Sequence, residues 1–123
     1  MKFTLSEMYP GYKKEEVPED VLKNLETLVK KLNDLGKYYS KPVVVKRGYR
    51  APDLNEKVGG VKNSPHMTGH AADLVDKDGE IDRFMMNNSD KLKKLGLYVE
   101  NPQETVGWCH IQFRKASTIF FNP

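Results

Sequence analysis

The sequence has little cysteine, no long apolar run and no strong excess of one charge, and each of these absences excludes a class of protein. The single Cys109 cannot form an internal disulfide, so a disulfide-stapled secreted domain is excluded and a cytosolic origin is the simpler expectation. No stretch approaches the roughly 18 consecutive apolar residues of a membrane helix. Residues 1–10 also lack the basic segment and apolar run of a secretory signal.

The charge balance argues against nucleic acid as a partner. Lysine and arginine total 20 against 17 aspartates and glutamates, a net charge of +3, and the basic residues are interspersed with acidic ones. A nucleic-acid-binding domain usually concentrates its basic residues on one face. The slight positive charge is compatible with approach to an anionic polymer.

The chain length of 123 residues suits one domain, which we expect to be monomeric, with residues 1–17 as an irregular N-terminal arm. From Pro18 to Leu35 the apolar residues recur every three or four positions, which predicts an amphipathic helix that ends at a left-handed Gly36. The valine run in residues 41–47 predicts a buried strand, and residues 48–68 predict a long loop that contains one helical turn at 52–57.

Further strands are expected at residues 70–75, 97–100 and 107–114, and further helices at 80–87 and 89–95. One long helix followed by a loop and several strands indicates an α+β fold with a small antiparallel sheet and flanking helices.

The three histidines lie in two short segments that also contain an aspartate, and this is the most informative pattern in the chain. Side chains alternate along a strand, so Asp73 would share a face with Ala71, and His110 would share a face with Trp108 and Gln112. His66 would approach from the loop before Asp73. Two imidazoles and one carboxylate make a three-ligand zinc site with an open position, although the spacing alone is equally compatible with ordinary polar residues.

Several motifs resemble those of one enzyme family. They are Gly48-Tyr49-Arg50 with Asn55, Val58-Gly59-Gly60-Val61, Ser64-x-His66-x-x-Gly69-x-Ala71-x-Asp73, and Trp108-x-His110. In this order they resemble the zinc peptidoglycan peptidases of the D-alanyl-D-alanine carboxypeptidase and L-alanyl-D-glutamate endopeptidase family, many of which are phage endolysins. The resemblance implies one zinc ion on His66, Asp73 and His110, and the α+β fold shared with the hedgehog signalling domain.

The same resemblance implies roles for two further residues. Arg50 would polarise the scissile carbonyl or hold a substrate carboxylate, since a guanidinium offers a planar fork of donors. Ser64 would hydrogen-bond the substrate or cap its own loop. His70 matches no ligand position, and we expect it to be exposed or to lie behind the ligands.

The chain departs from the family pattern at the general base. Many members have a carboxylate three residues before the last histidine ligand, where this sequence has Gly107. Glu104 and Glu100 are the candidate replacements. Glu104 is favoured because it is closer along the chain, whereas Glu100 ends a predicted strand that could neighbour the strand of His110; the third alternative is that neither is catalytic. Such a carboxylate must lie within hydrogen-bond reach of the attacking water.

These observations predict a zinc metallopeptidase that hydrolyses an amide bond in peptidoglycan stem peptides, either D-Ala-D-Ala or L-Ala-D-Glu, as a phage-type lytic enzyme. With no signal segment visible, the protein would stay in the cytoplasm until release to the cell wall, or travel with a phage particle. The alternative is a non-catalytic zinc-containing module of the same fold that binds wall peptide or a partner protein.

Overall fold

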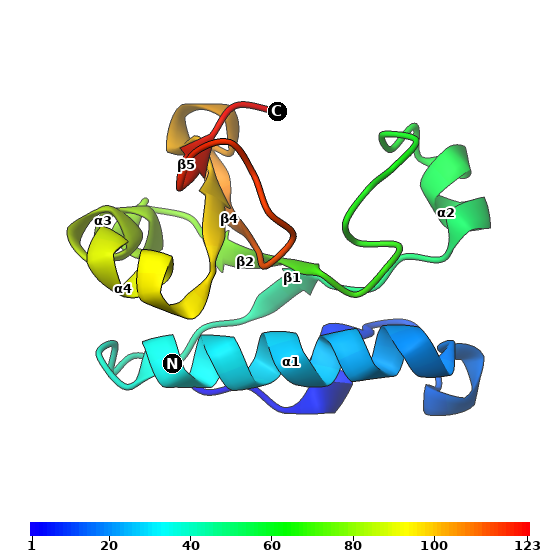
Figure 1. Cartoon of the computed structure of the whole chain (residues 1–123). Coiled ribbons are helices and arrows are strands. Elements are labelled where there is room, and N and C mark those ends of the chain that lie inside the picture. Colours follow the sequence, from blue (N-terminus) through cyan, green and yellow to red (C-terminus); the bar gives the residue numbers. More distant parts are fainter.

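A computed structural model describes all 123 residues and shows one long helix lying across a face of a small sheet (Figure 1). The helices are α1 (Glu19–Gly36), α2 (Pro52–Lys57), α3 (Glu80–Asn87) and α4 (Ser89–Leu95). The strands are β1 (Val45–Arg47), β2 (Ala71–Asp76), β3 (Tyr98–Glu100), β4 (Gly107–Gln112) and β5 (Phe120–Phe121). Three 3-10 turns complete the chain: η1 (Leu5–Met8), η2 (Lys14–Glu16) and η3 (Pro102–Glu104).

The sheet has the order β1-β2-β4-β3-β5, and every neighbouring pair is antiparallel except β3 and β5, which are parallel. The predicted α+β class is therefore confirmed, whereas the sheet is mixed rather than purely antiparallel. Strand β5 escaped prediction because a two-residue strand is too short to show an alternating pattern.

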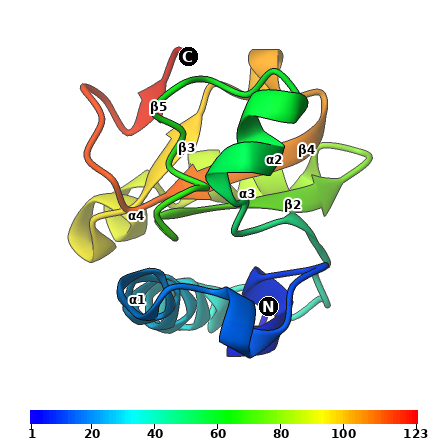
Figure 2. The ribbon, with the colours of Figure 1, turned by 90° about the vertical axis from the view of Figure 1, so that its right-hand side faces the viewer.

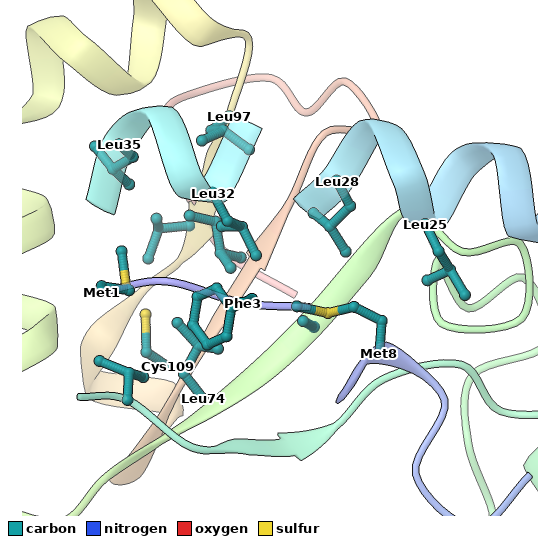
Figure 3. Close-up of a cluster of buried hydrophobic side chains, with 14 of the residues drawn as sticks. Met1, Phe3, Met8, Leu25, Leu28, Leu32, Leu35, Leu74, Leu97 and Cys109 are labelled. Atoms are coloured by element: carbon teal, nitrogen blue, oxygen red, sulfur yellow. The ribbon is translucent and has the colours of Figure 1, made fainter. Parts of the chain in front are cut away.

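The core lies between α1 and the face of the sheet toward it. The apolar stripe of α1 that the sequence predicts is buried, with Leu25, Leu28, Leu32 and Leu35 fully inaccessible to solvent. Figure 3 shows these leucines facing Leu74 of β2 and Cys109 of β4, with Leu97 beside them. Because strand side chains alternate, the opposite face of β2 and β4 remains available for polar residues.

The N-terminal arm is part of this core, which the sequence did not indicate. Met1, Phe3 and Met8 are buried between α1 and the sheet (Figure 3). The Met1 backbone passes so close to Gly36 that a Cβ atom there would lie 1.9 Å from the Met1 carbonyl oxygen. Gly36 is thus the last helical residue and serves this close approach, not the left-handed cap predicted for it.

The strand predicted for residues 41–47 is shorter than expected. Only Val45–Arg47 pair as β1, with an irregularity in the register against β2. Val43 is buried but Val44 is exposed, so the valine run crosses the edge of the core rather than lying within it. The turn at Pro52–Lys57 does form, as α2.

The long segment between β1 and β2 carries α2 away from the other helices. Figure 1 shows α3 and α4 at one side of the sheet and α2 at the other, and Figure 2 shows α2 above the N-terminal end of the chain. None of the helices combines the length and the apolar character needed to cross a membrane.

Candidate metal centre

Two central strands bring Asp73 and His110 together. In the antiparallel pairing of β2 with β4, Asp73 lies directly opposite His110, and directly opposed side chains on one face are close neighbours. His110 Nδ1 is 2.8 Å from Asp73 Oδ1. The adjacent residues Leu74, Cys109 and Ile111 point into the core, as the alternation predicts.

His66 comes from the segment that precedes β2. The backbone N–H of Arg50 donates to the His66 carbonyl at 3.2 Å, and His66 Nδ1 donates to the Gly48 carbonyl at 2.8 Å. These two bonds fix the loop and the ring together. His66 Nε2 is thereby turned toward Asp73, 3.3 Å from its Oδ2 atom.

His66, Asp73 and His110 form a group that fits a zinc ion. One ligand atom of each residue lies within 4.8 Å of the others, and all three side chains are buried. With its Nδ1–H donating to Gly48, the His66 ring has a lone pair on Nε2 for a metal ion. His110 Nε2 is 2.7 Å from Gln112 Oε1, which leaves the lone pair of that ring on Nδ1. Two imidazole nitrogens and one carboxylate, each ring oriented by a second hydrogen bond, are typical of a catalytic zinc site.

The charges of this group are strongly coupled. Burial by itself would raise the pKa of Asp73, but the hydrogen bonds from His110 and His66 hold it well below its usual range. For His110, burial would lower the pKa, but the hydrogen bond and charge of Asp73 outweigh it and the pKa is raised. These contacts therefore favour the protonated form of the His110 ring. A cation that binds here replaces a proton.

The ligand group lies in a cleft of about 350 Å³. Its lining residues are Arg47, Arg50, Val61, Ser64, Pro65, His66, Asp73, Glu100, Trp108, His110, Gln112, Phe121 and Pro123. Arg50 Nη2 is 3.4 Å from Ser64 Oγ, and Arg50 Nε is a buried donor that has no protein partner. Ser64 Oγ also accepts from the His66 backbone N–H at 3.2 Å, so this serine caps its loop.

The two candidate bases lie differently. Glu100, at the end of β3, lines the cleft, whereas Glu104 is exposed on η3 and does not belong to the lining. Burial raises the pKa of Glu100, and the charges of Asp73 and Glu104 add to this effect while that of His110 opposes it. Gly107 has a φ of +88°, a conformation that an L-residue rarely adopts. The backbone therefore favours glycine over a carboxylate residue at this position.

His70 does not belong to the ligand group. Its Nδ1 is 2.7 Å from Thr68 Oγ1, and its ring lies 4.5 Å from that of Phe113 between centroids. Burial, followed by the nearby charge of Arg114, lowers its pKa. This half-buried histidine therefore contacts Thr68 and Phe113 rather than the ligand group.

Sequence reasoning gave no role to three residues of the cleft. Arg47 Nε donates to Asp73 Oδ2 at 2.7 Å, and its guanidinium lies 4.8 Å from the centre of the Trp108 ring. Gln112 orients His110. The alternation along β4 places Trp108 and Gln112 on the face of His110, which is the signal that could have assigned them. For Arg47, which β1 presents at an irregular register, the sequence carries no such signal.

The fold thus presents three buried side chains that fit one metal ion in a cleft of about 350 Å³. A sequence profile of the peptidase M15 family matches residues 1–111. The chain therefore belongs to the peptidase M15 family.

Two individual proteins are similar to parts of the chain. A 34-residue stretch is 56% identical to the zinc D-Ala-D-Ala carboxypeptidase of Streptomyces albus G; it covers 28% of this chain and only 13% of that protein. The fold is similar to the crystal structure of the L-Ala D-Glu endopeptidase ChiX of Serratia marcescens, with a TM-score of 0.51 and 20% identity over 81% of this chain and 92% of that one.

Proposed function

We propose that this chain is a zinc peptidase that hydrolyses an amide bond in the stem peptides of peptidoglycan. The observation that carries the proposal is the buried group of His66, Asp73 and His110 in a cleft that also presents Arg50 and Glu100. Membership of the peptidase M15 family and the identity with a zinc D-Ala-D-Ala carboxypeptidase support the substrate class. The bond is D-Ala-D-Ala or L-Ala-D-Glu, the two that the motifs imply.

His66 Nε2, His110 Nδ1 and a carboxylate oxygen of Asp73 would hold the ion and leave its remaining position to the cleft. When bound, zinc supplies Lewis acidity toward a carbonyl and makes water nucleophilic near neutral pH. The protein keeps both histidines in the tautomers that expose these nitrogens.

Glu100 is the proposed general base. Its carboxylate lines the cleft, and its raised pKa brings it closer to the pH at which a group can both accept and return a proton. Glu100 would take the proton of the attacking water and deliver it to the amine that leaves. Glu104, the residue favoured from its spacing, is exposed and would act on Glu100 through its charge.

Arg50 is the residue proposed to stabilise negative charge on the substrate. Its buried Nε has no protein partner, so the guanidinium can satisfy its donors on a substrate carbonyl or carboxylate. Ser64 supports it through the contact between Ser64 Oγ and Arg50 Nη2. We assign Ser64 to holding Arg50 and the His66 loop in place, at the border of the substrate.

The first experiment tests the reaction and the metal. Zinc-loaded protein incubated with peptidoglycan should release new amino groups and no new reducing sugar ends, and a chelator should stop the release until zinc is restored. Elemental analysis should give one zinc per chain, which His110→Ala should lose. Folded, zinc-loaded protein that binds wall peptide but releases no amine from several wall types would instead establish the non-catalytic binding module.

The second experiment tests the base with a matched pair. Glu100→Gln should keep its zinc and lose about a hundredfold in turnover, since a positioned base is typically worth that much. Glu104→Gln removes the same charge nearby and should remain within a few-fold of the wild type. The reverse pattern would give the role to Glu104, and activity in both variants would mean that no carboxylate assists the water.

A phage-type lytic role is the biological setting that the motif resemblance favours. Addition of the protein to intact and to outer-membrane-permeabilised bacteria, with turbidity as the readout, tests it directly. Loss of turbidity that requires Glu100 would support lysis, and release of single amino acids without lysis would indicate a trimming enzyme.

A further inference from the structure

Arg47 projects from the end of β1 into the cleft, and none of the steps proposed above uses it. Two contacts hold its guanidinium: Nε donates to Asp73 Oδ2 at 2.7 Å, and the group lies over Trp108, 4.8 Å from the ring centre. The structure contains no hydrogen bond from its two terminal nitrogens, Nη1 and Nη2. The side chain is 41% exposed, so these nitrogens are within reach of a ligand.

A guanidinium that is fixed on one edge and one face loses little freedom when it binds a ligand. The free terminal nitrogens form the planar fork that matches the two oxygens of a carboxylate. We propose that Arg47 binds a free carboxylate of the peptide substrate and thereby determines which stem peptides the enzyme accepts. This inference rests on the proposed peptidase function and adds its specificity.

Glu100 lines the same cleft as Arg47, but the other charges near Arg47 favour an anion. The nearest carboxylate, Asp73, is already shared with two histidines and with Arg47 Nε. A neighbouring cavity of about 430 Å³ is lined by Arg47, Arg50 and Lys46, and no aspartate or glutamate belongs to its lining. The positive potential therefore extends beyond the cleft on the side of Arg47.

The size of the effect follows from the exposure of the side chain. Hydrogen bonds to charged groups are worth about tenfold to a hundredfold in affinity when buried. Because Arg47 is 41% exposed, water screens part of the interaction and we expect about tenfold. That preference should be expressed in binding, since the carboxylate is present in the ground state as well as in the transition state.

The experiment uses synthetic stem peptides in which each free carboxylate in turn is replaced by a carboxamide. For wild-type protein saturated with zinc, one replacement should raise KM about tenfold with kcat nearly unchanged. Arg47→Met should show the raised KM with the carboxylate peptide and no further increase with its amide. Equal KM values for all acid and amide pairs in the wild type would overturn the role of Arg47 while leaving the peptidase function intact. If none of the peptides is cleaved, both the role of Arg47 and the peptidase function are overturned.

Lys46→Met is the matched control, because it removes one positive charge from the residue directly before Arg47. Lys46 is exposed and lies outside the lining of the catalytic cleft. Lys46 adds only a water-screened charge in the neighbouring cavity, so this variant should retain most of the acid preference. Zinc affinity is measured in parallel, since Arg47 also contacts a ligand residue. A loss of zinc and an equal loss of rate on acid and amide peptides in Arg47→Met would show that the residue only supports Asp73. Trp108→Leu leaves the Asp73 contact in place and should weaken the preference without loss of zinc.

Discussion

Gln112 offers the sharpest test of how this chain prepares its metal ligands. Its side chain joins two partners: Nε2 donates to the Arg114 carbonyl at 2.8 Å, and Oε1 lies 2.7 Å from His110 Nε2. Because the amide nitrogen is engaged by a carbonyl, the amide oxygen must face the ring and accept its proton. Substitution of Gln112 by methionine keeps the length of the side chain and removes both bonds.

The expected cost follows from the burial of the pair. Gln112 and His110 are both buried, so a ring N–H left without its acceptor costs about 1–3 kcal/mol. The ring is also free to turn or to place its proton on Nδ1, the nitrogen needed by zinc. Loss of such an orienting partner typically lowers metal affinity about 10-fold to 100-fold. We therefore expect Gln112→Met to bind zinc about 30-fold more weakly than the wild type.

A competition titration against a chromophoric chelator at pH 7.5 measures this difference. Gln112→Glu is the control, because its carboxylate also accepts the Nε2 proton, and it should stay within a few-fold of the wild type. Far-ultraviolet circular dichroism confirms that each variant is folded. Equal zinc affinities for wild type and Gln112→Met would refute the idea that this hydrogen bond sets the tautomer of the ligand.

Three further outcomes are expected. The raised pKa of His110 means that protons compete with zinc, so zinc affinity should fall as the pH drops from 8 to 6, and a flat profile would contradict the ligand assignment. Burial, followed by the charge of Asp76, raises the pKa of Asp82 to about 7, so the folded state binds the extra proton and stability should fall as pH rises between about 4 and 7. The full pKa shift corresponds to about 4 kcal/mol, and solvent screening reduces this. In urea unfolding, Asp82→Asn should therefore raise the free energy of unfolding by about 2 kcal/mol at pH 8 and by little at pH 4. Equal gains at the two pH values would exclude a titration effect. Gly36→Ala improves helix propensity by about 1 kcal/mol but places a Cβ 1.9 Å from the Met1 carbonyl oxygen, so its melting temperature should fall, and a rise would show that the arm yields easily.

The sequence predicted those features that depend on local periodicity. The three-to-four spacing of the leucines in α1 and the alternation in β4 both correspond to buried faces of the structure. The motif resemblance implied His66, Asp73 and His110 as ligands, and the structure brings these side chains together within 4.8 Å. Periodicity alone could not pair Asp73 with His110, because strand register depends on which strands are neighbours.

The features that escaped prediction depend on contacts between distant segments. The burial of Met1 and Phe3 follows from the groove between α1 and the sheet, which no local pattern of the arm reveals. For the base, sequence distance from His110 favoured Glu104, while Glu100 remained a candidate because it ends a predicted strand. The structure places Glu100 in the lining of the ligand cleft because β3 is the neighbour of β4, whereas Glu104 lies on η3, is exposed and does not line the cleft.

The three ligands come from two separate parts of the fold. Two of the ligands belong to the central strands of the sheet, whereas His66 belongs to the segment from residue 48 to residue 70, which carries α2 and one wall of the cleft. A metal ion held by all three would fasten this segment to the sheet and divide one long loop into two shorter ones, which lowers the entropy cost of keeping it ordered. The ion would thus stabilise the cleft wall proposed to bind the substrate, in addition to its role in the reaction. Chelation should accelerate amide hydrogen exchange in α2 far more than in α1.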